Sequence, residues 1–140
     1  MRRLLALAAL SALAVASSAS AETWKPYSAV SATGLQWSYD TDYSYRDAQS
    51  KRVVVMQAVG KPGATPRLGP SAPGAADGVG NVMALDCKAK NLILVASYAP
   101  KKPLELSPTW RAATPKKVSS DEDKALLDAA CAGADQLATR

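Results

Sequence analysis

The chain has 140 residues, a formal net charge of +5, two cysteines, and neither histidine nor phenylalanine. Without histidine, catalytic triads with a histidine base and histidine-ligated zinc sites are excluded. The cationic side chains are scattered rather than grouped in a long block, which argues against a nucleic-acid partner.

The N-terminus has the features of a secretory signal peptide in the usual order. Met1-Arg2-Arg3 is basic, residues 4–15 are apolar apart from one serine, and Ala19-Ser20-Ala21 has the small residues of a cleavage site. The apolar run is shorter than the roughly 20 residues that span a bilayer. We therefore expect residues 1–21 to be a signal peptide and the protein to be exported, periplasmic or secreted. Because Glu22 follows the cut, no lipid-anchor cysteine is expected.

Residues 22–140 are long enough for one domain with one core. Cleavage would remove Arg2 and Arg3 and lower the net charge from +5 to +3. Two widely separated cysteines in an oxidising compartment predict one disulfide, Cys87–Cys131, rather than a redox motif. The alternative is a pair of buried free thiols.

The first part of the domain is predicted to form three strands of an antiparallel meander, separated by small and polar residues. The aromatic residues of the second strand share odd positions and are expected to line one face. The predicted strands are residues 23–30, 35–45 and 51–59, and the aromatics are Trp37, Tyr39, Tyr43 and Tyr45.

Residues 60–80 interrupt this pattern. They hold six of the eight glycines and four of the nine prolines, with few sizeable apolar side chains. Such a segment cannot bury enough surface to offset its ordering entropy. We expect a flexible loop, either a binding loop or a tolerated insertion.

The second part is predicted to contain two further strands, residues 81–87 and 92–99, and a short sixth strand at residues 109–113. Strand alternation places Cys87 on the apolar face with Met83 and Leu85. The turn between the two strands contains Asn91, which is suited to a positive φ angle.

The C-terminal segment is predicted to be one helix over residues 120–137. Ser119 and Glu122 fit a capping box, and Leu127, Cys131, Ala134 and Leu137 recur on one face. The predicted fold class is therefore α+β: an antiparallel sheet of about five to six strands, with a C-terminal helix packed on it and tied by one disulfide.

The order of features resembles the surface-adhesin protein E family of Gram-negative bacteria over nearly the whole exported part. The motifs that carry the resemblance are an early Trp24, YDTDYS (39–44), Asp86-Cys87 followed by LILVASYA (92–99), a late Trp110 and LLDAAC (126–131). The resemblance implies the same sheet and disulfide-tied helix. It also implies a binding function, since the founding member is an outer-membrane lipoprotein that binds laminin, vitronectin and plasminogen and can dimerise.

No catalytic constellation is evident. Asp40 and Asp42 are placed on one face of a strand and could support acid–base chemistry or hold a cation, but such pairs are more commonly a solvated strand face. We expect no enzyme activity, no cofactor and no metal site. Trp24, Trp37 and Trp110 are candidates for contact anchors or for packing.

Basic residues at strand ends and loops are the candidate ligand-binding residues. If they cluster in space, they would attract acidic glycans or acidic protein surfaces. They are Lys51, Arg52, Lys88, Lys90, Lys101, Lys102, Lys116 and Lys117.

The sequence therefore predicts a non-enzymatic exported binding protein with a protein partner, either a host matrix or serum protein or an envelope protein. A homodimer formed through edge strands is compatible with this organisation. The alternative is a soluble periplasmic envelope protein, an inhibitor or assembly factor, that has the same fold without adhesion.

Overall fold

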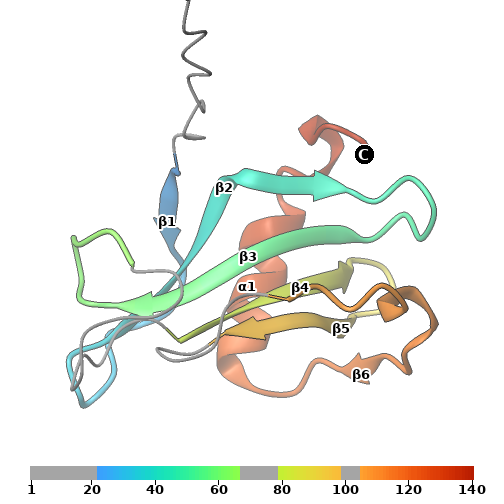
Figure 1. Cartoon of the computed structure of the whole chain (residues 1–140). Helices are drawn as coiled ribbons and strands as arrows, with labels where there is room; N and C mark the ends of the chain where they lie inside the picture. Colours follow the sequence, from blue (N-terminus) through green and yellow to red (C-terminus); the bar gives the residue numbers. More distant parts are fainter. Residues whose placement is uncertain (1–21, 67–78, 99–104) are drawn as a thin grey trace, which may run out of the picture.

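A computed structural model of the protein describes residues 22–66, 79–98 and 105–140. The described chain forms one six-stranded antiparallel sheet in which the strands follow each other in sequence order (Figure 1). The strands are β1 (Trp24–Pro26), β2 (Gln36–Arg46), β3 (Val53–Gly60), β4 (Gly80–Asp86), β5 (Asn91–Tyr98) and β6 (Lys116–Lys117). The helices are η1 (Trp110–Ala112), α1 (Asp121–Cys131) and η2 (Ala134–Gln136). The predicted α+β class is confirmed.

Three sequence predictions concern residues outside the described ranges. The signal peptide, residues 1–21, is one of them. Most of the predicted flexible loop, residues 67–78, is the second, and the Lys101–Lys102 pair is the third. These remain predictions.

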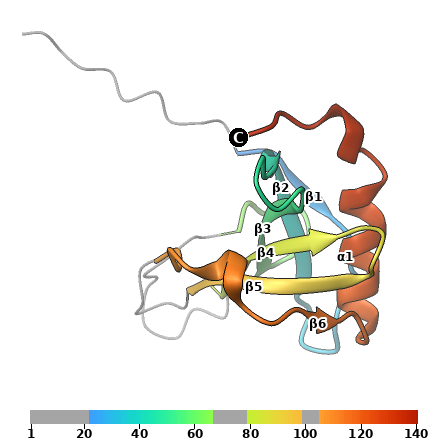
Figure 2. The same ribbon diagram turned by 90° about the vertical axis from the view of Figure 1, so that its right-hand side faces the viewer.

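Helix α1 covers one face of the sheet, as seen edge-on in Figure 2. Leu126, Leu127 and Ala130 of the helix pack against Met83 and Leu85 of β4. Cys87 follows on the same face and forms the predicted disulfide with Cys131, with the two Cα atoms 5.8 Å apart. The alternation of β4 therefore locates the disulfide correctly.

The opposite face of the sheet is also covered. A second cluster there contains Val54, Met56, Val82, Ala84, Ile93, Val95, Ala96 and Trp110. Nearly all of β3 and β4 is buried, as expected for strands packed on both faces. Residues 109–113 are not the predicted strand, because Trp110 lies in a 3-10 turn that places its ring on this face. The sixth strand is Lys116–Lys117 instead.

The prediction of a single aromatic face on β2 is wrong. An irregularity between Asp40 and Tyr45 shifts the register against β3, so Tyr39 packs on the helix side while Tyr43 and Tyr45 pack on the other. The buried Asp40 carboxylate stabilises the bulge, because its Oδ1 accepts the backbone N–H of Asp42 at 2.9 Å. Asp40 pairs with Met56 and Tyr45 pairs with Val54, so β2 has three more residues than β3 between these pairs. An odd number of extra residues inverts every later side chain.

Helix α1 starts and ends differently from the prediction. Ser120, not Ser119, is the N-cap, and its hydroxyl accepts the N–H of Asp123 at 3.0 Å. The helix stops at Cys131, two residues before Gly133, which is a poor helix former. Arg46 then donates to the carbonyl oxygen of Ala134 at 2.9 Å, and the tail runs alongside the end of β2 with a bridge between Arg46 and Thr139.

The two edge strands are very short, with three residues in β1 and two in β6. Short edge strands are one way in which natural sheets limit pairing with other chains. The homodimer remains a prediction.

Asp47 joins the β2–β3 turn to the distant η1 segment. Its side chain is 1% exposed and accepts hydrogen bonds from the backbone N–H and hydroxyl of Ser50, both at 2.7 Å. The guanidinium of Arg111 donates to both carboxylate oxygens and lies over the Trp110 ring, 4.6 Å from its centroid. The hydrogen bonds from Arg111, assisted by those from Ser50, hold the pKa of Asp47 well below its usual range.

This depressed pKa predicts an acid-sensitive contribution to stability. An unfolded Asp titrates near pH 3.9, so the contribution of Asp47 is complete above about pH 4 and is lost as the pH falls toward its lower folded pKa. We expect Asp47→Asn to lower the urea midpoint at neutral pH and to flatten its fall below about pH 4. The control Asp128→Asn, an exposed carboxylate on α1, should keep the wild-type profile. An Asp47→Asn profile parallel to wild type would contradict this role.

Candidate functional site

The Asp40–Asp42 pair has structural roles. Besides supporting the bulge, Asp40 accepts the backbone N–H of Thr23 at 3.1 Å, and Asp42 accepts the Thr23 hydroxyl at 2.6 Å. The two carboxylates thus attach the chain before β1 to β2. Within the described ranges, no group of three or more His, Cys, Asp or Glu side chains could hold a metal ion.

The meander brings most of the predicted basic residues to one end of the sheet. The β2–β3 turn and the β4–β5 turn lie at the same end (Figure 1), and the register of β6 places Lys117 opposite Asn91 and Lys116 opposite Leu92. We call this region the basic end and define it by Lys51, Arg52, Lys88, Lys90, Lys116 and Lys117. All five lysines are exposed.

Arg52 is the member of the basic end that is engaged inside the fold. Its Nη1 donates to the side-chain oxygen of Asn91 at 2.8 Å, and the residue is only half-exposed. Asn91 also pairs with Lys117 across β5 and β6. Arg52 therefore connects the two turns, and the lysines supply the accessible charge.

The nearby carboxylates are occupied by other partners. Asp47 pairs with Arg111, and Asp135 pairs with Arg46 at 3.1 Å. Asp86 accepts the backbone N–H groups of Lys88 and Ala89 at 3.0 and 2.9 Å. Among the described residues, none of the five lysines forms an ion pair with a carboxylate, so their charges are available to a partner.

Two of these lysines have a strained backbone. Lys51 has φ 63° and Lys90 has φ 51°, and they are the two non-glycine residues with positive φ in the described part of the chain. The sequence prediction had assigned positive φ to Asn91, one position too late. The left-handed region costs a residue with a Cβ about 1–2 kcal/mol. Such strain is often found at functional sites.

Glycine substitutions at positions 90 and 88 distinguish the cost of the strained backbone from the effect of losing a lysine charge. Lys90→Gly relieves the strain but increases the freedom of the unfolded chain, and the balance should raise the free energy of unfolding by about 0.5 kcal/mol. Lys88→Gly removes the same charge at a residue without positive φ and should lower it by about 0.5–1 kcal/mol. Urea unfolding of the two variants measures both free energies. A Lys90→Gly protein that is less stable than wild type would show that the Lys90 backbone is not strained.

A hollow of about 550 Å³ lies on the helix side of the basic end. Lys51 and Lys88 line it together with Ser50 and the Cys87–Cys131 disulfide, and the carboxylates of Asp86 and Asp135 also line it. Because Cys87 directly precedes Lys88, the disulfide ties the β4–β5 turn to α1. The two lysines therefore flank a hollow whose wall is covalently fixed.

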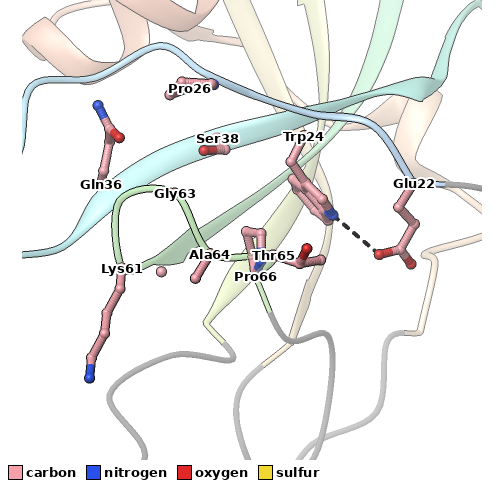
Figure 3. A pocket seen from close by; sticks show the side chains of 11 residues that line it. Glu22, Trp24, Pro26, Gln36, Ser38, Lys61, Gly63, Ala64, Thr65 and Pro66 are labelled. Atoms are coloured by element: carbon pink, nitrogen blue, oxygen red, sulfur yellow. Dashed lines mark hydrogen bonds between the residues drawn. The ribbon is translucent and has the colours of Figure 1, made fainter.

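A second, smaller pocket lies at the other end of the sheet, where Gln36 of β2 pairs with Gly60 of β3. Its volume is about 230 Å³, and it lies between β1, the start of β2 and the turn after β3 (Figure 3). The half-buried Trp24 forms part of its wall, and its indole N–H donates to Glu22 at 3.1 Å. No sequence pattern predicted this pocket.

The three tryptophans therefore have different environments. Trp110 is in the core, 5% exposed. Trp37 is half-buried beside the N-terminus of α1, where it lines a hollow with Tyr27 and Ala125. Trp24 lines the small pocket at the end of the sheet.

None of the helices in the described part of the chain has the length and apolar character that a bilayer crossing requires. No protein-family model, no curated protein and no solved structure matches the chain.

Proposed function

We propose that the protein is a non-enzymatic, exported binding protein whose basic end docks on an acidic surface of a host matrix or serum protein. The observation that carries the proposal is the gathering of five exposed lysines on two turns and an edge strand that are far apart in the sequence, with no carboxylate partner among the described residues. Asp86 and Asp135 lie beside these lysines, but positive charge is in excess at this end. An excess of one sign accelerates association with an oppositely charged partner.

The rigidity of the basic end supports the same proposal. The β4–β5 turn is held by the Cys87–Cys131 disulfide and by the Asp86 side chain, and Arg52 connects it to the β2–β3 turn. Groups that are ordered before binding lose less conformational entropy when they bind. Lysines on fixed turns therefore bind an acidic surface at a lower entropic cost than lysines on a mobile tail.

Export and the kind of partner rest on the sequence. The signal-peptide pattern predicts export, a disulfide suits an oxidising compartment, and the resemblance to surface-adhesin protein E implies matrix or serum partners. The test is binding of the purified protein to immobilised laminin, vitronectin and plasminogen over a range of salt concentrations. We expect at least one of them to bind and its affinity to fall as salt rises, because exposed charges are screened over about 10 Å at 0.1 M ionic strength.

Absence of binding to all three proteins would remove the matrix and serum partners. Cell fractionation then distinguishes the alternative, since retention in the periplasm would favour the envelope protein without adhesion. Binding that does not depend on salt would remove the role of the basic end while leaving a binding function.

A further inference from the structure

The small pocket at Trp24 combines an apolar surface with polar groups, of which only Glu22 and Lys61 are charged. Trp24 and Pro26 come from β1, Gln36 and Ser38 come from β2, and Pro66 and its neighbours come from the turn after β3. The pocket volume of about 230 Å³ is below the roughly 300 Å³ at which drug-sized ligand sites begin. Its size therefore suits a single small ring.

The orientation of Trp24 is fixed from two sides. The indole packs on the second core cluster, and its N–H donates to Glu22. The hydrogen bond satisfies the polar edge of the ring, so the rest of the indole presents apolar surface. A half-buried tryptophan of this kind offers a rigid platform for stacking at a low entropic cost.

The polar groups of the pocket are mostly uncharged and include both donors and acceptors. Ser38 and Thr65 contribute hydroxyl groups, which can donate and accept. Gln36 uses its amide nitrogen to donate to the Ser28 carbonyl at 2.8 Å, and its amide oxygen remains an acceptor. The Lys61 side chain points away from Trp24 in Figure 3, so no ammonium group faces the indole.

A pyranose ring matches this combination. It has an apolar face of C–H groups that stacks on an aromatic ring, and a rim of hydroxyl groups that both donate and accept. We propose that this pocket binds one hexopyranose ring of a neutral saccharide. The site is at the opposite end of the sheet from the basic end and is independent of the proposed function.

The test uses the indole N–H signals of the three tryptophans in a two-dimensional NMR spectrum. The probes are methyl glucopyranoside, methyl galactopyranoside and N-acetylglucosamine. At least one probe should shift the Trp24 signal with a Kd in the millimolar range, as expected for one ring on a small site. The Trp37 and Trp110 signals should stay in place.

Substitutions inside and outside the pocket show whether the saccharide binds at Trp24. Trp24→Ala, which lacks the reporting indole, is followed through the backbone amide signals of Gln36 and Ser38, and the probe should no longer shift them. Ser38→Ala, which leaves the aromatic platform intact, should weaken binding about fivefold through loss of one hydrogen bond. Thr114→Ala removes an exposed hydroxyl outside the pocket and should bind as wild type. Reversal of the basic-end lysines should leave the saccharide response unchanged, so the two proposals fail or succeed separately.

A Trp24 signal that no saccharide probe shifts would overturn the proposal. An unchanged affinity in Ser38→Ala would also overturn it, because the pocket's hydroxyl groups would then not contact the ring. A polyproline peptide that shifts Trp24 while the saccharides do not would assign the pocket to peptide binding instead.

Discussion

Replacing both Cys87 and Cys131 by serine should lower the free energy of unfolding by about 4 kcal/mol. The disulfide closes a loop between residues 44 positions apart, and the chain-entropy model gives about this value for a loop of that length. The loss is large beside the roughly 5–15 kcal/mol that stabilise a typical domain. Urea unfolding of the double variant and the wild-type protein measures the difference.

Repeating the unfolding measurement with a reducing agent provides a control. A reductant should lower the urea midpoint of the wild-type protein toward that of the double serine variant, and it should leave the variant unchanged. If the wild-type and variant proteins unfold at the same urea concentration, the disulfide does not stabilise the domain. Helix α1 would then be held on the sheet by Leu126, Leu127 and their contacts alone.

Strand alternation and the cysteine count were sufficient to predict the central part of the fold. A continuous β-branched run predicted β3, and the side-chain period of two placed Cys87 on the face that α1 covers. With only two cysteines, the pairing had one solution. These features depend on local pattern and on composition, which a sequence contains directly.

The features that were missed depend on contacts between distant segments. The Asp40 carboxylate that stabilises the bulge of β2 also binds the backbone N–H of Thr23, 17 residues earlier. The 3-10 turn at Trp110 depends on the contact of Arg111 with Asp47, 64 residues earlier. After helix α1 ends at Cys131, the Arg46 side chain donates a hydrogen bond to the carbonyl oxygen of Ala134. Local pattern does not encode such pairs.

The candidate site was predictable in part. In a meander, the β2–β3 and β4–β5 turns necessarily fall at one end, so the proximity of Lys51 to Lys88 follows from the strand assignment. The position of Lys116 and Lys117 could not be derived from the strand assignment, because the sequence predicts the sixth strand at residues 109–113. The internal role of Arg52 and the pocket at Trp24 required side-chain positions.

Reversing three lysines of the basic end should weaken binding to an acidic matrix or serum protein by about 100-fold. Each Lys→Glu change removes an attraction of about 0.5 kcal/mol and adds a repulsion of similar size, so three changes cost about 3 kcal/mol. The variant combines Lys51→Glu, Lys88→Glu and Lys117→Glu. Its control combines Lys25→Glu, Lys61→Glu and Lys124→Glu, three exposed lysines elsewhere on the described surface, so both proteins have the same net charge.

The ratio of the affinities of these two variants shows whether the protein binds its partner through the basic end. The measurement is the Kd for whichever of laminin, vitronectin and plasminogen the wild-type protein binds, at one low salt concentration. We predict that the control stays within about threefold of wild type while the basic-end variant loses about 100-fold. Equal losses in the two variants would mean that net charge, rather than the assembled turns of the sheet, determines binding, and would contradict the proposed function.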